Sequence, residues 1–528
     1  MGSASSSDYG ADAPIKRAAV LAGVLALLVY LPNLWNDFAW DDGYLIVGNP
    51  SVHDFTQARS WFFEPWSAGS SLGSGREQNA LYWRPLAQAS YALDWSIGVW
   101  FTGRGVPLPF HVTNDLLHAL ASVFVALLAG RLARDLGATR TWFGANLAAL
   151  VAGCLYAVHP VHGEAVNLAT YRTTLLSDAA VLGAMWLHLR RGHALLVAGA
   201  LAIGLMAKES ALVLPGMLVV LDLAVKTRRT LLEHVRAYGP ALLVLVGYLV
   251  IHRSVTGPPK LDFFAGATAG ETAVTMFAVY RLYLGLLLVP WPLTSFYDWS
   301  IMPIRGSLGD PEALAGLVLL VLTIGAGLWA LWRTLRGLEP SRAAALILIG
   351  AGLLLVGLAP YAHLVTFFDL CGERFLHLAG AGPLIAAGIA VAISQSQQGR
   401  MGRLVPWLVV AIGLVFAAFT ATRAPRFGSS QTMLLETARW FPASFNAHYG
   451  LGQGWIARGE WEKAVANFEA AHAILPDLDV ATLSLADALV RAGREADANA
   501  FISAEVTRRK LTTGLLVDAV EAKALSND

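Results

Sequence analysis

The stretch AAVLAGVLALLVYLPNL, residues 18–34, decides the class of fold. It contains no charged residue, and as a helix rising about 1.5 Å per residue it covers most of the ~30 Å apolar core of a bilayer. Lys16 and Arg17 precede it, it is too long for the core of a signal peptide, and no small-residue cleavage site follows it. We therefore expect a retained membrane helix that begins on the cytoplasmic side.

The composition of the whole chain agrees with a protein dissolved mainly in lipid. Of its 528 residues, 56% are hydrophobic and 14% are charged, against about 45–50% and about 25% in soluble proteins. The net charge of +1 lacks the basic excess of nucleic-acid-binding proteins, so no nucleic-acid partner is expected. The two cysteines, Cys154 and Cys371, form neither a disulfide framework nor a zinc-type spacing.

Ten further apolar runs bring the expected number of transmembrane helices to about eleven, because backbone groups in lipid must be satisfied within a helix. They are 110–130, 142–158, 173–189, 194–206, 210–225, 236–252, 312–332, 343–362, 375–394 and 404–420. Basic clusters mark cytoplasmic loops, and their alternation with the runs predicts a multi-pass cell (inner) membrane protein with its N-terminus inside and its C-terminus outside. The apolar segment 271–288 contains Arg281 and breaks this parity, so we predict that it is re-entrant or lies at the outer interface.

Long apolar runs stop near residue 427, and a repeat with a period of 34 residues follows. Counted from Phe445, the small and large packing positions of a tetratricopeptide repeat hold Leu451, Gly452, Trp455, Ala464, Phe468, Ala471 and Pro476. A weaker repeat starts near Asp479, with a leading helix expected at 430–442 and a closing one at 508–525. The alternative is an unrelated helical hairpin.

The expected fold is therefore all-α, a polytopic membrane helix bundle followed by a tetratricopeptide-repeat domain. Residues 1–17 form a cytoplasmic tail, residues 18–426 the membrane domain, and residues 427–528 the repeat domain. Within the membrane domain, residues 36–109 form a large extracytoplasmic first loop.

By the same parity the long polar stretches share the outer face, and the first of them is NDFAWDD, residues 36–42. Its adjacent carboxylates, Asp41 and Asp42, follow an apolar helix end. A carboxylate in that setting suits a general base. The alternative is an acidic loop that caps a helix.

Several cations in these stretches would suit an anionic lipid headgroup, because arginine clamps a phosphate with two hydrogen bonds and lysine acts as a point charge. Ionisable residues at membrane depth usually mark a site or a pathway. The candidate phosphate-binding residues are Arg84, Arg172, Lys208, Arg281 and Arg374. The alternatives are an aromatic belt anchor around Arg84 and local ion pairs at Lys208-Glu209 and Glu373-Arg374.

The stretch HPVHGE, residues 159–164, has the residue types of a metal site but not the helical HExxH arrangement. We expect a hydrogen-bonded loop at the mouth of a cavity and no metal. The residues expected to shape that cavity are His159, His162, Glu164, Glu209, Tyr297, Asp298 and Glu373. The sequence has no GxxxxGK[ST] phosphate loop and no GxSxG elbow, so an activated substrate would arrive through the membrane.

The order of these motifs resembles that of a known family. NDFAWDD is similar to the acidic first-loop motif of the GT-C glycosyltransferase superfamily. It is followed by YWRPLAQASYALD (82–94), PFHVTNDLLHAL (109–120), HPVHGEAV (159–166), AKESALVLPGMLVVLDL (207–223) and ERFLHLAGAG (373–382). This order, with the added repeats, resembles the transmembrane and tetratricopeptide-repeat-containing O-mannosyltransferase family and its bacterial relatives.

The resemblance implies an inverting transferase that takes a sugar, often mannose, from a polyprenyl-phosphate donor on the extracytoplasmic side. A first-loop aspartate would be the base, Asp42 slightly before Asp41, and no cofactor beyond the lipid-linked donor would be needed. The repeat domain would dock an acceptor protein. One departure concerns the family pattern Arg-x-Asp-Leu-Leu, which here reads Arg172-Thr173-Thr174-Leu175-Leu176, with Asp178 displaced.

Physical chemistry is consistent with that implication. A phosphate leaving group needs charge stabilisation rather than a second carboxylic acid, so one base and several cations suffice, unlike the paired acids of glycosidases. Two alternatives remain open at this point. One is a transferase that acts on a glycan or a lipid, and the other is a non-enzymatic scaffold in which the membrane helices anchor the repeats.

Overall fold

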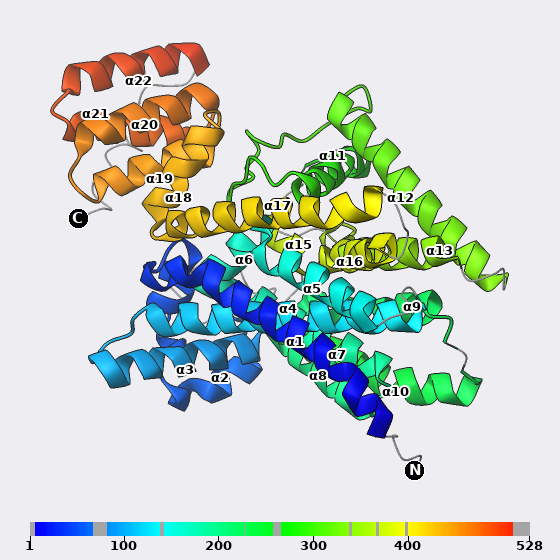
Figure 1. The fold of residues 1–528 in the computed structure, drawn as a ribbon. Helices are drawn as coiled ribbons and strands as arrows, with labels where there is room; N and C mark the ends of the chain where they lie inside the picture. Colours follow the sequence, from blue (N-terminus) through cyan, green and yellow to red (C-terminus); the bar gives the residue numbers. More distant parts are fainter. Residues whose placement is uncertain are drawn as a thin grey trace. The chain divides into compact units, whose positions relative to one another are not determined.

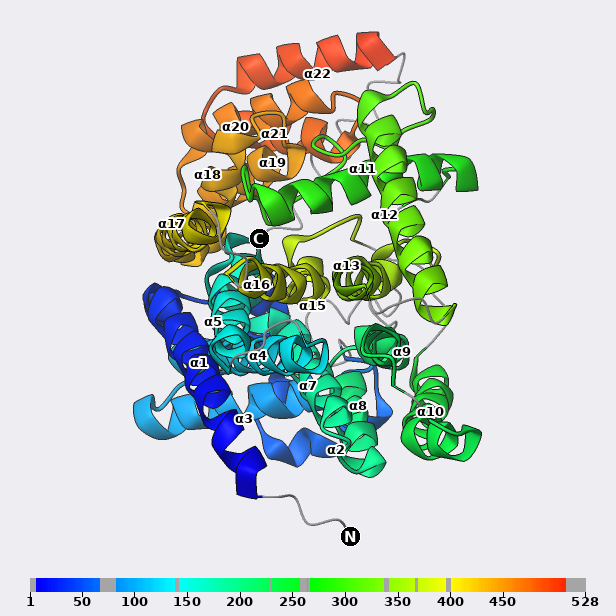
Figure 2. The same cartoon turned by 45° about the vertical axis from the view of Figure 1, so that its right-hand side comes forward.

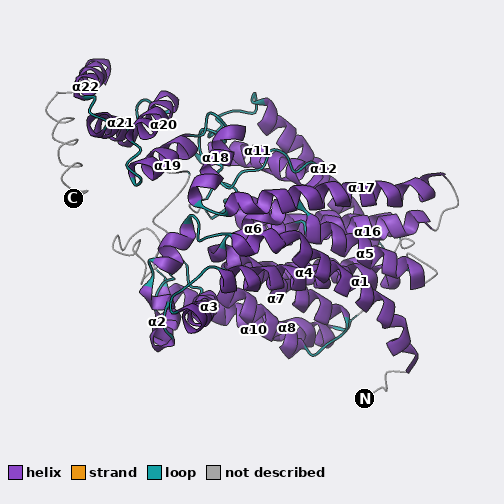
Figure 3. Ribbon diagram, turned by 60° about the vertical axis from the view of Figure 1, so that its left-hand side comes forward, coloured by secondary structure: helices purple, strands orange, loops and turns teal. Residues whose placement is uncertain are grey.

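The computed structural model describes residues 6–66, 82–137, 142–227, 229–256, 264, 266–336, 341–365, 369–395 and 400–509. Two compact units are present, one formed by Met1–Leu293 with Arg305–Gly428 and the other by Thr294–Ile304 with Ser429–Asp528. Their long helices are seen in Figures 1 and 2. Figure 3 shows helices and loops but no strand over the described residues, which confirms the expected all-α class.

The first unit consists of long helices joined by short helical turns. The long helices are α1 (Ser6–Tyr30), α3 (Pro85–Thr102), α4 (Leu108–Asp135), α5 (Trp142–Val158), α7 (Arg172–Leu189), α8 (Ala194–Ala207), α9 (Leu214–Ala224), α10 (Leu231–Val255), α11 (Ala269–Leu288), α12 (Pro311–Leu335), α16 (Ala381–Gln395) and α17 (Arg400–Arg423). The short ones are α2 (Ala58–Phe63), α6 (Gly163–Asn167), α13 (Arg342–Ile347), α14 (Leu353–Leu358) and α15 (Leu376–Ala379).

Among the described residues, seven helices are long and apolar enough to cross a membrane, and two bent pairs would raise the number to nine. The chain is thus a multi-pass membrane protein with fewer such helices than the eleven expected. The expected crossings at 173–189, 194–206 and 210–225 are not among them. Helices α8 and α9 have only 14 and 11 residues, and α7 carries polar side chains including Thr173, Thr174 and Asp178.

Segment 271–288 differs from its expected form, because α11 is one unbroken helix of membrane-spanning length. The unbroken helix contradicts a re-entrant segment, and the alternative position at the outer interface stays a prediction. Arg281 is accommodated within α11 because it forms an ion pair of 2.6 Å with Glu312 at the start of α12. The two helices lie very close together, since a Cβ added to Gly316 of α12 would meet the carbonyl oxygen of Phe277 at 1.8 Å.

Small residues let α1, α4 and α5 pack tightly, as is usual for helices in membranes. A Cβ at Gly153 of α5 would lie 2.6 Å from Ala126 of α4 and 2.8 Å from Ala22 of α1. Gly130, near the end of α4, faces Ile15 near the start of α1. Helices α1 and α4 therefore run in opposite directions, and the residues that follow α1 lie at the end where α4 begins.

The second unit contains α18 (Ser430–Trp440), α19 (Phe445–Ile456), α20 (Trp461–Ile474), α21 (Asp479–Arg491) and α22 (Glu495–Arg509). The pairs α19–α20 and α21–α22 begin 34 residues apart, at Phe445 and Asp479. This is the period that the sequence predicts, and α18 occupies the position of the expected leading helix. The expected closing helix at 508–525 lies outside the described residues apart from its first two.

The second unit also includes a segment from far away in the sequence, Thr294–Ile304. The Asp298 carboxylate accepts hydrogen bonds from the Ser444 hydroxyl at 2.8 Å and the Asn446 amide at 2.9 Å, at the start of α19. Thr294 shares a hydrogen bond of 2.9 Å with Thr437 of α18. The chain between α11 and α12 thus stabilises the first turns of the C-terminal helices.

The close packing of α19 against α20 can be tested with two glycines of the same helix. A Cβ at Gly452 would meet the Phe468 ring at 2.6 Å, whereas a Cβ at Gly454 meets nothing within 4 Å. Gly452→Val should destabilise the α19–α20 pair by about 1–3 kcal/mol through overpacking. Amide hydrogen exchange of the full chain should be faster in α19 and α20 for Gly452→Val and close to wild type for Gly454→Val. Equal protection in the two variants would contradict the packing.

Candidate functional site

Asp42 is the more deeply buried of the two adjacent aspartates that follow α1. Both of its carboxylate oxygens accept hydrogen bonds from the protein. The residue is fully buried. One carboxylate oxygen accepts from the backbone amide and the hydroxyl of Thr170, at 2.8 and 2.9 Å. The other accepts from the amides of Ala39 and Ala169, at 3.1 and 3.3 Å. Asp42 therefore joins its own turn to the segment with Ala169 and Thr170, and four donors from the protein occupy its two oxygens.

Asp41 is half-buried and has a different environment. Within the described residues its carboxylate accepts one hydrogen bond, from the Tyr171 hydroxyl at 3.5 Å. Trp40, just before it, has a left-handed backbone (φ 54°), which is uncommon for a residue other than glycine and turns the chain sharply here. The Asp42 carboxylate thus accepts hydrogen bonds from the backbone on both oxygens, whereas Asp41 keeps acceptor capacity, the reverse of what the slight preference for Asp42 as the base would require.

The surroundings raise the pKa of both carboxyl groups toward neutral pH. Burial raises the pKa of Asp41 to about 7, with repulsion by Asp369 adding to the shift and attraction by Arg374 opposing it. Burial also raises the pKa of Asp42 to about 6, against the lowering effect of its hydrogen bonds from Thr170 and Ala39. A general base works best when its pKa lies near the operating pH.

Arg374 connects this acidic turn to two further segments. Its guanidinium forms a bond to the fully buried Glu164 and one of 2.5 Å to Asp369, while its backbone amide donates to Glu164 at 2.8 Å. The guanidinium also stacks 4.3 Å from the centre of the Tyr171 ring. Arg374 is thus held beside the residue that donates to Asp41.

Lys208, in the turn between α8 and α9, is buried yet has few protein partners. Its ammonium donates to the Thr174 hydroxyl at 2.9 Å and lies 5.3 Å from the centres of the Tyr361 and Phe375 rings. Burial lowers its pKa to about 8, aided by repulsion from Arg84 and Arg374. A lysine ammonium has three donors. Among the described residues no carboxylate forms an ion pair with it, and Glu209 and Asp178 act on it only at longer range. A buried cation in this state is suited to an anionic ligand.

The other predicted cations are already paired within the protein. Arg84 forms a two-pronged pair with Glu209, at 2.6 and 3.2 Å, and stacks on Trp66 and Tyr82. Arg172 is fully buried, pairs with Asp94 at 2.5 Å and donates to Asn114 at 2.9 Å. It also donates to the carbonyls of Ser90 and Phe110. Its guanidinium thus joins α3, α4 and α7, and its donors are occupied by the protein.

The HPVHGE turn forms the hydrogen-bonded loop that the sequence predicts. His159 accepts from the Val161 amide at 3.3 Å and lies 3.1 Å from the Leu287 carbonyl oxygen. His162 is fully buried among the rings of His118, Tyr156 and His377. In the part of the chain that the structure describes, no group of three or more His, Cys, Asp or Glu side chains is arranged to hold a metal ion.

Neighbouring charges in the sequence do not pair with each other. Glu373 binds Arg423 of α17 through both oxygens, at 2.6 and 3.1 Å, while Arg374 binds Glu164. Glu209 likewise binds Arg84 rather than Lys208. Each of these contacts joins separate elements, so the alternative of local ion pairs does not hold.

Three predicted site residues lie elsewhere. Arg281 is about two-fifths exposed and pairs with Glu312 on α12. Asp298 caps the segment that belongs to the C-terminal unit and bonds Ser444. Tyr297 lies in the same segment, which belongs to the C-terminal unit.

The structure also adds residues to the site that the motifs do not single out. Thr170 fixes Asp42, Asp369 competes with Asp41 for Arg374, and Arg423 neutralises Glu373. Thr170 lies shortly before Arg172, and Asp369 lies shortly before the stretch ERFLHLAGAG. Closeness to a motif was therefore the signal in the sequence that could have identified these two residues. Arg423 carries no local signal, because it ends an apolar helix and pairs with a residue 50 positions away.

Comparisons with known proteins agree with the order of the motifs. The chain is 26% identical over 501 residues to the protein O-mannosyl-transferase TMTC4 of Mus musculus and 24% identical over 515 residues to that of Homo sapiens. Each match covers 85% of this chain and 65% of the relative. Identity is 34% over 206 residues to the protein O-mannosyl-transferase Tmtc2 of Drosophila melanogaster, which covers 36% of this chain and 20% of that protein.

The chain thus spans somewhat less than two thirds of the length of the TMTC4 proteins that it matches. No protein-family model matches the sequence, and no solved structure matches the fold. The similarities confirm the resemblance that the motifs predict, and they relate most of this chain to proteins named protein O-mannosyl-transferases.

Proposed function

We propose that this chain is a membrane glycosyltransferase of the GT-C type. It moves a sugar, most simply mannose, from a polyprenyl-phosphate donor to a hydroxyl group, of serine or threonine in a protein. Two observations carry the proposal: Asp41 is a half-buried carboxylate with acceptor capacity, and Lys208 is a buried ammonium with donor capacity. Both lie within electrostatic reach of the same side chain, Arg374. The names of the relatives support the choice of mannose and of a protein acceptor.

The chemistry follows from these groups. Asp41 accepts the proton of the acceptor hydroxyl as its oxygen attacks the anomeric carbon of the sugar. The bond from that carbon to the phosphate oxygen breaks, and the electron pair leaves with the polyprenyl phosphate. Lys208 stabilises the charge that develops on the phosphate, and Arg374 adds positive potential close by. A single displacement of this kind inverts the configuration at the anomeric carbon.

The distribution of charge supports transfer on the extracytoplasmic side. Lys16 and Arg17 precede α1, and Arg131 and Arg134 lie at the end of α4 that packs near them. Positive residues gather on the cytoplasmic side of membrane proteins. Asp41 follows the opposite end of α1, and the C-terminal unit would present acceptor proteins on that same side.

The assignment of the base is tested by removing each carboxylate charge separately. Asp41→Asn should lower kcat for transfer from radiolabelled polyprenyl-phosphate mannose by about 100-fold or more, as loss of a general base does. Asp42→Asn should lower the thermal stability of the purified protein, because four donors face its carboxylate. A stable Asp42→Asn protein without activity beside a fully active Asp41→Asn would reverse the two roles. Wild-type protein that neither binds nor uses the donor would overturn the proposed function.

The pH dependence tests the same base in another way. Since burial raises the pKa of Asp41 to about 7, its carboxylate is protonated and inactive at lower pH. Activity should therefore rise with pH through about 7 rather than through the ordinary aspartate range near pH 4. The rate of wild-type protein in lipid nanodiscs, measured between pH 5 and pH 8, checks the sign, and a flat profile would exclude Asp41 as the titrating base.

The role of Lys208 is tested through the donor concentration dependence. Lys208→Gln should raise KM for the lipid-phosphate donor by about tenfold, because a buried charged contact to the phosphate is lost. Lys463→Gln, which removes an exposed lysine from the C-terminal unit, is the matched control and should leave KM unchanged. An unchanged KM in Lys208→Gln would remove Lys208 from the donor site.

A further inference from the structure

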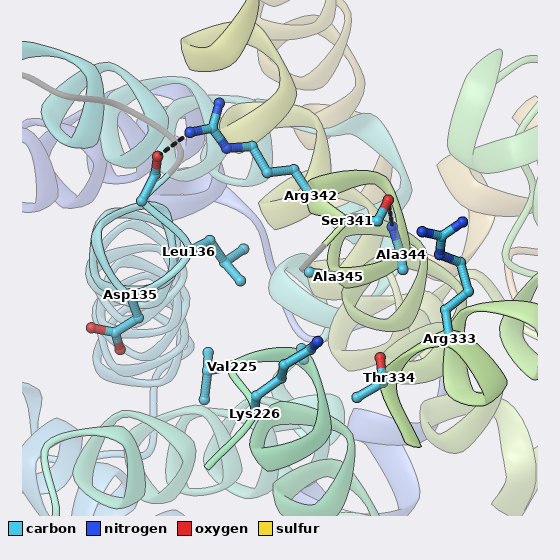
Figure 4. A pocket seen from close by; sticks show the side chains of 12 residues that line it. Asp135, Leu136, Val225, Lys226, Arg333, Thr334, Ser341, Arg342, Ala344 and Ala345 are labelled. Atoms are coloured by element: carbon cyan, nitrogen blue, oxygen red, sulfur yellow. Dashed lines mark hydrogen bonds between the residues drawn. The ribbon is translucent and has the colours of Figure 1, made fainter. Parts of the chain in front are cut away.

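A second feature of the membrane unit is a basic cavity, whose lining side chains are drawn in Figure 4. Its volume is about 350 Å³, and it is lined by the last residues of α4, α9 and α12 and the first residues of α13. Three cations line it, Lys226, Arg333 and Arg342, against one carboxylate, Asp135. The cations come from three separate elements, so no single helix makes this charge excess.

Two helices relate the cavity to the candidate active site. Helix α4 begins beside the turn that carries the aspartates, where Phe110 meets Phe38, and ends at Asp135 in the cavity. The membrane-length segment Arg342–Tyr361 begins in the cavity and ends with the Tyr361 ring near Lys208. Twenty helical residues span about 30 Å, the thickness of the apolar core of a bilayer. The cavity and the candidate active site therefore belong to opposite faces of the membrane.

The cationic groups of the cavity are held in place by the protein. Arg342 donates to the carbonyl oxygen of Gly137 at 2.6 Å, which uses one of its five donors. Arg333 stacks 5.5 Å from the centre of the Trp329 ring. A second cavity of about 300 Å³ shares Asp135, Val225 and Lys226 and adds Arg131 and Arg191 to the same end. The positive potential thus extends beyond the first cavity.

The same end of the unit is exposed on its α12 side. Trp329 and Trp332 are 42% and 47% exposed, and only 11% of the apolar window of α12 is buried within the protein. Half-exposed tryptophans at the end of a membrane helix are typical of the interface between headgroups and acyl chains. Leu136, Ala344 and Ala345 give the cavity an apolar wall beside its cations.

We propose that this cavity binds the phosphate headgroup of an anionic phospholipid from the leaflet opposite the candidate active site. Arginine and lysine side chains converge on a recess of suitable size at headgroup depth, and basic pockets between the ends of membrane helices recognise such headgroups. A soluble phosphate compound carries the same charge, but it has no acyl chains to contact the apolar wall or the lipid-facing side of α12. This binding does not depend on the proposed transferase activity.

Native mass spectrometry of the full chain in detergent tests the proposal with dioleoyl-phosphatidylglycerol and dioleoyl-phosphatidylcholine as probes. Wild-type protein should bind the anionic lipid about tenfold more tightly than the neutral one. Lys226→Gln/Arg333→Gln should remove most of that preference, and Arg333→Gln alone serves if the double variant does not fold. Lys16→Gln/Arg236→Gln is the matched control, because it removes one lysine and one arginine that are exposed and do not line the cavity.

Three results would overturn the proposal. One is a preference for phosphatidylglycerol in the cavity variants that is as strong as the preference of the wild-type protein. Another is an equal loss in the control variant, which would mean that general surface charge holds the lipid. The third is displacement of phosphatidylglycerol by inorganic phosphate alone, which would make this a site for a soluble anion. No effect of inorganic phosphate, with loss confined to the cavity variants, supports a lipid site.

Discussion

The ion pair between Glu164 and Arg374 is the contact on which the end of the membrane unit that carries the acidic turn depends. Glu164 is fully buried and Arg374 nearly so, and an unpaired charge at such a depth would cost several kcal/mol. The pair therefore fixes the turn after α5 against the turn before α15. The same guanidinium stacks on Tyr171, whose hydroxyl donates to Asp41. The position of the proposed base is thus a consequence of satisfying buried charge.

The rule that buried charges must be paired also separates structural groups from groups available to a substrate. Asp42 and Arg172 carry the same charges as Asp41 and Lys208. Hydrogen bonds within the protein, however, occupy both oxygens of Asp42 and every donor nitrogen of Arg172. Such saturated groups hold segments together. The direct contacts of the Lys208 ammonium are a hydroxyl and two aromatic rings, and Glu209 and Asp178 attract it from farther away. Its donors therefore keep capacity for an anionic ligand.

The sequence was sufficient for the helical class, the resemblance and the 34-residue period, because each rests on a repeated local pattern. It was not sufficient to predict which charged side chains form ion pairs with one another. Adjacent residues such as Glu373 and Arg374 point in different directions on a helical turn, and their real partners, Arg423 and Glu164, lie far away in the chain. Apolar composition also does not reveal helix length, since α8 is a short helix that ends before Lys208. Nor does it reveal that the loop with Asp298 joins the C-terminal unit.

The most direct test of this account is a structure of the full chain in nanodiscs with a polyprenyl-phosphate mannose analogue that cannot be transferred. The account predicts the analogue's phosphate within hydrogen-bonding distance of the Lys208 ammonium, with the anomeric carbon on the side of Asp41. A phosphate bound instead at Arg281, or in the cavity lined by Lys226 and Arg333 at the opposite face, would contradict it.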